Sequence, residues 1–184
     1  MSLAHSNMMP LGTKAPSFNL RNVMDDQPTT LIDARGAKGT VIMFICVHCP
    51  YVILVQDEIA AISKEYQNHG VEFVAISSND INNYPQDAPA FMKEQAEAVD
   101  FDFPYLYDED QEVAKAYGAE CTPDFFVFDE NDHCVYRGRL DDATPGNGVP
   151  VTGKDLRGAL SLLVSGDDIP EDQLPSMGCN IKWK

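Results

Sequence analysis

The feature that most constrains this fold is a buried-strand pattern that runs directly into two cysteines. Residues 40–45 form a largely apolar run of strand length, as expected of a central strand buried on both faces. Cys46-Val47-His48-Cys49-Pro50 follows, and apolar residues then recur in steps of three and four at Val52, Val55, Ile59, Ile62 and Tyr66. This spacing predicts an amphipathic helix that Pro50 can begin and Gly70 can end. Because residues 71–77 read as a second buried strand, we expect a right-handed parallel strand–helix–strand unit.

Cys46 and Cys49 therefore lie at a predicted strand-to-helix junction. Two thiols separated by two residues close a disulfide only where the backbone bends, and the first turn of a helix provides that bend. Its unpaired N–H groups and its dipole favour the reactive thiolate. The same spacing also supplies half of many zinc sites, but a second C-x-x-C or an H-x-x-x-H pair is absent. The pattern thus favours a redox-active dithiol, with no metal.

Composition limits the classes of partner. The 184 residues fit one domain, which we assign to residues 13–184 after an N-terminal tail at 1–12. A net charge of −16 repels nucleic-acid phosphates and anionic membranes, so neither is expected as a partner. The first twelve residues lack the pattern of a signal peptide, and no run is long enough to span a bilayer. We therefore expect a cytoplasmic protein, in which each of the five cysteines must be judged individually.

The remaining strands and helices are predicted from the spacing of apolar residues and from the positions of proline and glycine. Residues 17–20 and 29–32 read as a hairpin, and Cys121-Thr122-Pro123 opens an apolar strand whose antiparallel partner is residues 135–140. We expect helices at 90–99, 111–117 and 155–164, a loop at 79–89 and an irregular tail at 166–184.

This arrangement resembles the thioredoxin fold, in the branch of the alkyl hydroperoxide reductase and thiol-specific antioxidant superfamily, which comprises peroxiredoxin-like proteins or redoxins. Within it the chain is similar to a subgroup with a C-x-H-C-P segment. The matching stretches are residues 44–51, 77–80, 84–87, 103–108, 121–126, 136–142 and 178–184. The resemblance implies an α/β thioredoxin fold with an N-terminal β-hairpin extension, a helix inserted after the second core strand and an irregular C-terminal tail. The subgroup commonly has asparagine at the position of Val47, and Cys134 is not part of its pattern.

The resemblance also implies roles for individual residues. Pro123 would be a cis proline facing the dithiol, and the backbone of Thr122 would dock the substrate. We expect a thiol-disulfide oxidoreductase in which Cys46 attacks a substrate disulfide and Cys49 resolves the mixed disulfide. The partners would be a disulfide-containing protein or small molecule and a thiol electron donor, with no cofactor. His48 would lower the thiol pKa and make the reduction potential more positive than thioredoxin's, unless it is a solvated surface residue.

Two other functions compete with this interpretation. Peroxiredoxins carry P-x-x-x-T-x-x-C, and aligning that cysteine on Cys49 places Ile42 at the proline position and Cys46 at the threonine position. Peroxide reduction by Cys49 or Cys46 is therefore the weaker alternative. A third possibility is copper or zinc binding by Cys46, His48, Cys49 and Cys121.

The remaining candidates stay open on sequence alone. Cys179 and Cys121 are each either a third redox thiol or a packed residue, and Cys134 is expected to serve packing. Asp141 and Asp142, which follow Arg139, either line a site or form a charged turn. The oligomeric state is not predicted.

Overall fold

A seven-stranded mixed sheet forms the centre of the computed structural model, which describes residues 2–184. Its strand order is β3-β2-β6-β5-β4-β8-β9, with bounds Pro28–Thr30, Asn19–Asn22, Tyr105–Tyr107, Val71–Ser77, Gly39–Phe44, Asp124–Asp129 and Cys134–Gly138. β4, β5 and β6 run parallel, and β8 lies antiparallel to β4 on its other side. The predicted strand–helix–strand unit is therefore confirmed as β4, α2 (Pro50–Gln67) and β5.

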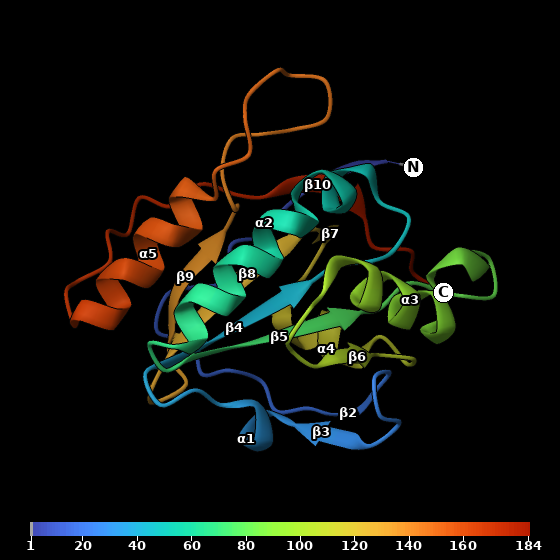
Figure 1. Ribbon diagram of the computed structural model, residues 1–184, viewed down its shortest axis with the longest axis horizontal. Coiled ribbons are helices and arrows are strands. Elements are labelled where there is room, and N and C mark those ends of the chain that lie inside the picture. The colour runs from blue at the N-terminus through green and yellow to red at the C-terminus, as the bar shows by residue number, and fades with distance from the viewer. Residues whose placement is uncertain (1) are drawn as a thin grey trace.

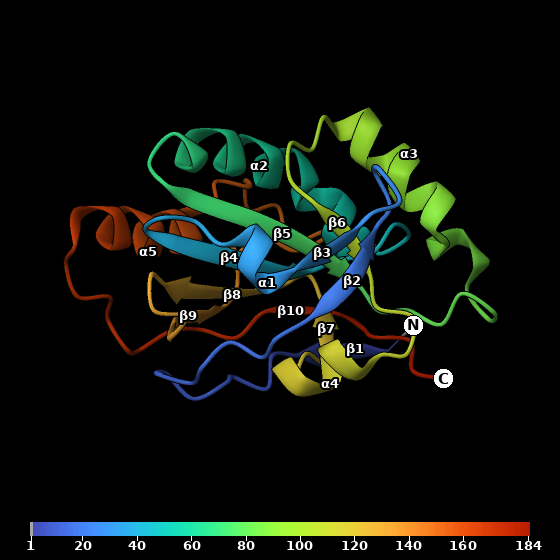
Figure 2. The same ribbon diagram turned by 90° about the horizontal axis from the view of Figure 1, so that it is seen from below.

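Helices cover both faces of this sheet. α2, α3 (Pro89–Val99) and α5 (Lys154–Ser165) pack on one face, as Figures 1 and 2 show. The short α1 (Leu31–Ala34) and α4 (Glu112–Tyr117) contribute to the core on the other face. Alternate residues of β4 point into the two cores, and all six are buried. This two-sided burial is why the sequence of β4 reads as a continuous apolar run.

The expected N-terminal hairpin is confirmed as the antiparallel pair β2–β3, and the inserted helix is confirmed as α3. Three short elements of the main sheet and its connections were missed. Tyr105–Tyr107 forms β6, and a 3-10 turn (Pro85–Asp87) interrupts the expected loop. The strand expected at 29–32 ends at Thr30, because Thr30 and Asp33 form a capping box that begins α1 at Leu31. Strands of three residues carry too little alternation to be recognised from sequence.

Both chain ends contribute to a second, three-stranded sheet. β10 (Met177–Asn180) lies between β1 (Leu3–His5) and β7 (Cys121–Thr122). The expectation of an irregular C-terminal tail is therefore wrong for residues 177–180, and the segment assigned to an N-terminal tail contains a paired strand. Both strands gain regular structure only by pairing with partners distant in sequence, which local patterns do not reveal. None of the helices within residues 2–184 has the length and apolar character required to cross a membrane.

Candidate active site

The two cysteines of the C-x-x-C segment lie where β4 ends and α2 begins. Cys49 is the N-cap residue of α2, and Pro50 occupies the first helical position, as predicted. Cys46 and Cys49 are 1% and 0% exposed, so a substrate must displace a covering segment before it reaches either sulfur.

The loop that carries the cysteines is held by Asp87, at the end of the 3-10 turn. Its fully buried carboxylate accepts hydrogen bonds from the backbone N–H groups of Val47 (3.0 Å) and His48 (3.1 Å) and from Asn79 Nδ2 (2.8 Å). Its second oxygen also lies 2.5 Å from His48 Nδ1. A carboxylate with several donors can remain buried without a large penalty. No role was predicted for Asp87, although it lies in one of the stretches that carried the resemblance.

His48 is not a solvated surface residue. Its side chain is 16% exposed, its ring stacks on that of Tyr84, and it contacts Asp87. Its Nε2 is buried and has no hydrogen-bond partner among the described residues 2–184. The direct partner of the imidazole is thus a carboxylate, so His48 helps to fix the loop, and its predicted effect on the thiols stays a prediction.

Several donors surround the sulfur of Cys49 and lower its pKa to about 5. The largest contribution is a hydrogen bond from Cys46, burial opposes it, and Cys179 and the Thr122 hydroxyl also lower the pKa. The N–H group of Val52, in the first turn of α2, further stabilises a negative sulfur, although it makes no capping hydrogen bond of normal geometry. Cys49 is therefore predominantly a thiolate at neutral pH.

Cys46 has the opposite environment. Its hydrogen bond to Cys49 raises its pKa well above the usual value, and burial and the charge of Asp87 act in the same direction. Only Thr122 favours the ionised form, through a hydroxyl 3.4 Å from the sulfur. Their mutual hydrogen bond therefore raises the pKa of Cys46 and lowers that of Cys49, so the two thiols titrate as a pair.

The segment opposite the dithiol is the Thr122–Pro123 turn, whose peptide bond is cis, as the resemblance implied. Thr122 contacts both cysteines, because its hydroxyl faces Cys46 and its carbonyl oxygen lies 3.2 Å from Cys49 Sγ. However, the backbone of Thr122 is already paired with β10, opposite Cys179. A substrate strand cannot use this edge while β10 occupies it.

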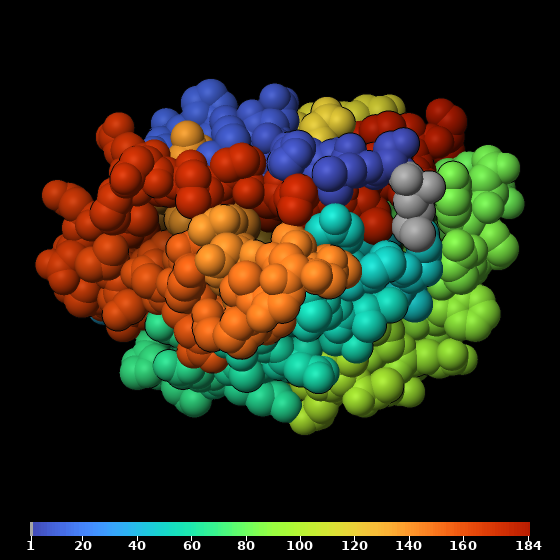
Figure 3. All heavy atoms as spheres, turned by 90° about the horizontal axis from the view of Figure 1, so that it is seen from above, coloured from blue at the N-terminus to red at the C-terminus, as the bar shows by residue number. Residues whose placement is uncertain are grey.

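A small groove of about 180 Å³ opens beside Pro123. Its lining includes Tyr51 and Val55 of α2, Arg139 to Thr144 after β9, and Pro175 to Met177. The loop between β9 and α5 (orange) lies between α2 (cyan) and the C-terminal segment (red) in Figure 3. Arg139 forms an ion pair with Asp155, and Asp141 accepts from the N–H groups of Thr152 and Gly153. Arg139, Asp141 and Asp142 thus line the groove beside Pro123.

The other three cysteines differ in their distance from the site. Cys179 Sγ lies 2.8 Å from Cys49 Sγ. Cys121 is buried two residues before Pro123, and burial raises its pKa far above the usual range. Cys134 is buried in the other core, and burial raises its pKa to about 11. The environment of Cys134 is consistent with packing.

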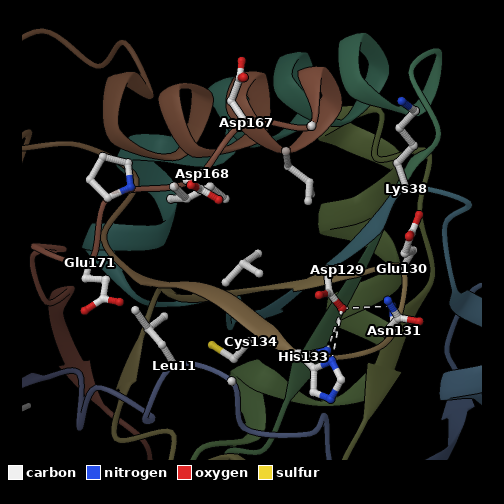
Figure 4. Close-up of a pocket in the computed structure, with 16 residues that line it drawn as sticks. Leu11, Lys38, Asp129, Glu130, Asn131, His133, Cys134, Asp167, Asp168 and Glu171 are labelled. Atoms are coloured by element: carbon white, nitrogen blue, oxygen red, sulfur yellow. Dashed lines mark hydrogen bonds and ion pairs between the residues drawn. The ribbon is translucent and has the colours of Figure 1, made fainter.

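The large cavity in Figure 4, about 990 Å³, lies away from the dithiol. Lys38, Asp129 and Glu130 line one side, and Asp167, Asp168 and Glu171 line another. Cys134 also lies on its wall, but none of its lining residues belongs to the C-x-x-C segment. The smaller groove is lined by Tyr51, which follows the C-x-x-C segment, and by Pro123 of the turn opposite the dithiol, so we place the candidate active site beside it.

The residues that could bind a metal together differ from those expected from the sequence. Within residues 2–184, the potential ligands that lie within 4.8 Å of one another are Cys46, His48 and Asp87. Cys49 and Cys121 are not in this group. Asp87 already accepts several hydrogen bonds, so its oxygens have little capacity left for a cation.

The environment of Cys49 gives a pH-dependent prediction. Ultraviolet absorbance of the reduced protein should show one thiolate that forms with a midpoint near pH 5, well below the ordinary thiol pKa of about 8.5. Because the folded-state pKa is depressed, the stability that this thiolate contributes is present above the unfolded pKa and is lost as pH falls through about 5. Cys49→Ser should abolish this transition, and Cys134→Ser should leave it unchanged. A first transition above pH 8 would contradict the assignment.

Comparison with known proteins identifies the family. Residues 10–156 match the family model described as Redoxin. An uncharacterized conserved protein from Geobacillus kaustophilus is 55% identical (TM-score 0.98), with 100% of this chain and 97% of that chain covered. A hypothetical protein from Sinorhizobium meliloti 1021 is 42% identical (TM-score 0.95), with 98% of both chains covered.

A more distant structure shares the fold alone. A secreted disulfide oxidoreductase of Mycobacterium tuberculosis is 14% identical (TM-score 0.60), with 78% of this chain and 94% of that chain covered. No curated protein matches the sequence. The mixed sheet, the dithiol at the start of α2 and the cis proline opposite it agree with the family match, and the chain belongs to the Redoxin family.

Proposed function

We propose that this protein is a thiol-disulfide oxidoreductase that uses Cys46 and Cys49 as its redox couple. The observation that carries the proposal is the position of the pair, at the start of α2 and against Thr122 of the cis Thr122–Pro123 turn, and the thiol pKa values support it. Cys49 has a pKa of about 5, and Cys46, its hydrogen-bond donor, has a raised pKa. A thiolate beside a protonated thiol is what disulfide exchange requires of a reduced enzyme.

The reaction would proceed in two exchanges. The Cys49 thiolate attacks one sulfur of a substrate disulfide, forms a mixed disulfide and expels the other substrate sulfur as a thiolate. Cys46 then loses its proton, attacks Cys49 Sγ and expels the second substrate thiolate. One substrate disulfide is reduced to two thiols, and the Cys46–Cys49 disulfide forms in its place. A thiol donor must then reduce that disulfide.

These roles reverse the order expected from sequence, which made Cys46 the nucleophile. The earlier expectation relied on the position of Cys46 at the strand end, but both cysteines are equally buried. We favour Cys49 because its hydrogen bonds with Cys46, Cys179 and Thr122 lower its pKa, whereas the hydrogen bond to Cys49, burial and the charge of Asp87 raise that of Cys46.

Peroxide reduction by Cys49 is the second candidate, and its low pKa favours it. The threonine position of the peroxiredoxin segment is occupied by Cys46. A thiol at this position donates a weaker hydrogen bond than a hydroxyl to an attacking peroxide. Disulfide exchange, which uses a second thiol directly, therefore fits the site better.

The test compares two substrates on one preparation. Reduced protein should be oxidised by a small or protein disulfide, with loss of two thiols and formation of a Cys46–Cys49 disulfide identified by peptide mass mapping. Turnover with a disulfide should exceed turnover with hydrogen peroxide, and Cys134→Ser should behave as wild type. Faster turnover of peroxide, or a protein that keeps all its thiols in excess disulfide, would overturn the proposal.

A further inference from the structure

Three cysteines, rather than two, meet at the active site. Cys49 is hydrogen-bonded to Cys46 on one side, and its sulfur lies 2.8 Å from that of Cys179 on the other. A covalent S–S bond is about 2.05 Å long, so the observed contact is a hydrogen-bonded pair that needs only a small approach to become a disulfide. Cys49 is thus the member that both possible pairs share.

The position of Cys179 is fixed by the second sheet. Its strand, β10, pairs with β7 so that Cys179 is opposite Thr122, and with β1 so that Cys179 is opposite Leu3. Beyond the strand, the N–H group of Lys182 donates to Asn79 at 2.8 Å. The segment that carries Cys179 is therefore held on both sides and after its end.

Gly178 allows the close approach of this strand to the cis-proline turn. A Cβ atom at this position would lie 2.0 Å from the carbonyl oxygen of Thr122 and 3.3 Å from the nitrogen of Pro123. Both are backbone atoms, so a larger residue would force β10 away from β7. Glycine before Cys179 is thus a condition for bringing its sulfur to Cys49.

From this geometry we propose that Cys179 is a third redox-active residue, which forms a disulfide with Cys49. The inference rests on the proposed function for the disulfide that supplies it. The Cys179 thiol loses its proton and attacks Cys49 Sγ in the Cys46–Cys49 disulfide. The Cys46–Cys49 bond breaks as the Cys49–Cys179 bond forms, and Cys46 leaves as a thiolate that takes up a proton. One disulfide replaces another, so no further oxidant or reductant is consumed.

Oxidation of Cys49 changes the charge next to Cys179 in a way that favours this exchange. Burial and the Cys49 thiolate raise the pKa of Cys179 to about 12, and Lys182 acts in the opposite direction. Once Cys49 is in a disulfide its negative charge is gone, so the electrostatic obstacle to ionising Cys179 is smaller. The exchange is therefore coupled to the oxidation of Cys49.

The consequence is a second oxidised state. With the disulfide moved to Cys179, Cys46 is again a thiol while the protein still holds the oxidising equivalent. β10, which occupies the backbone edge of Thr122, would then be covalently fixed to the start of α2. The C-terminal segment thus acts as an internal partner at the position where a substrate strand would otherwise pair.

The test uses Cys46→Ser, in which only the second pair remains. The reduced variant is treated with oxidised glutathione, quenched in acid, and analysed by intact mass and peptide mapping. We expect loss of two thiols, no retained glutathione and a Cys49–Cys179 cross-link. The double variant Cys46→Ser/Cys179→Ser should instead stop with one glutathione bound to Cys49.

A second control tests whether the cross-link requires β10 to hold Cys179 close to Cys49, or only the presence of both thiols. Gly178→Ala in the Cys46→Ser background keeps every thiol but displaces β10, so the yield of the cross-link should fall several-fold. Gly158→Ala, where an added Cβ meets nothing within 4 Å, should leave it unchanged. Circular dichroism confirms that each variant is folded.

The outcomes distinguish the inference from the proposed function. A Cys46→Ser protein that retains glutathione or stays fully reduced overturns the role of Cys179, even where the wild type forms a Cys46–Cys49 disulfide. A Cys49–Cys179 cross-link in this variant, together with a wild type that never forms a Cys46–Cys49 disulfide, supports the role of Cys179 and overturns the proposed couple.

Discussion

Cys49→Ser is expected to reduce disulfide turnover to the level of the uncatalysed reaction, a larger loss than any other single cysteine replacement produces. The reason is connectivity, because both Cys46 and Cys179 reach their disulfide through the sulfur of Cys49. Protonation adds to the effect. At pH 7 a thiol with a pKa of about 5 is about 99% ionised. Cys49→Ser removes that thiolate, and in the variant burial and the charge of Asp87 still raise the pKa of the remaining Cys46 thiol.

The low pKa of Cys49 also affects the step in which the enzyme disulfide is reduced again. Intrinsic nucleophilicity falls as pKa falls, which offsets part of the gain in thiolate fraction, but a low-pKa sulfur is a better leaving group. A disulfide that contains Cys49 should thus be reduced readily by an incoming thiol. The same stabilisation of the thiolate should make the disulfide more oxidising than that of thioredoxin, whose potential is about −270 mV. The expected positive shift, first attributed to His48, now rests on the donors around Cys49.

The measurement is turnover of a protein disulfide by the wild type, Cys46→Ser, Cys49→Ser and Cys134→Ser. Cys134→Ser is the matched control, since that thiol is buried in the opposite core. Cys46→Ser should retain a first exchange with substrate, detected as a covalent adduct or as the internal cross-link. Turnover by Cys49→Ser at more than one tenth of the wild-type rate would contradict the central role of Cys49.

Much of this site could be predicted because its pattern is local. The buried strand, the two cysteines, the proline and the amphipathic helix are adjacent in sequence, and their physical requirements agree with one another. The cis Thr122–Pro123 bond was expected only through the resemblance to a family. A lone proline at the start of a strand is compatible with either isomer, and cis is the rare state.

The parts that were missed depend on contacts between distant segments. Asp87 is one carboxylate among many in an acidic chain, and only the fold shows that it receives the N–H groups of the cysteine loop. The strand around Cys179 appeared irregular because its pairing partners, β1 and β7, lie at least 55 residues away in sequence. The pKa of Cys49 also depends on Thr122 and Cys179, which are distant in sequence, so the spacing of the two cysteines alone could not predict it.

Different residues contact the dithiol on its two sides, and they have different effects on it. On one side Asp87 and His48 fix the loop, and the charge of Asp87 adds to the hydrogen bond with Cys49 and to burial in raising the pKa of Cys46. On the other side Thr122 and Cys179 supply donors to Cys49. Thr122 lies against both sulfurs, but Asp87 acts on Cys46 and Cys179 acts on Cys49. Replacing Asp87 should therefore alter stability and the pKa of Cys46, whereas replacing Cys179 should alter the pKa of Cys49.

Asp87→Ala is expected to lower the free energy of unfolding by about 3–5 kcal/mol, because each buried donor left without a partner costs about 1–3 kcal/mol and some will find water. The groups affected are the N–H groups of Val47 and His48, the amide of Asn79 and the His48 ring. For a chain of this size the midpoint of thermal unfolding should fall by on the order of 10 °C. Chemical denaturation of the reduced protein measures the change.

Two further variants separate the hydrogen bonds from the charge. Asp87→Asn retains a carbonyl oxygen for the loop N–H groups but loses the charge, so it should recover part of the stability while the pKa of Cys46 still falls. Asp168→Ala, at an exposed position, should change stability by less than about 0.5 kcal/mol. If Asp87→Ala unfolds within 1 kcal/mol of the wild type, on the scale of a surface replacement, the carboxylate does not hold the loop. In that case the rigid placement of Cys46 beside Cys49 must come from the packing of β4 and α2 alone.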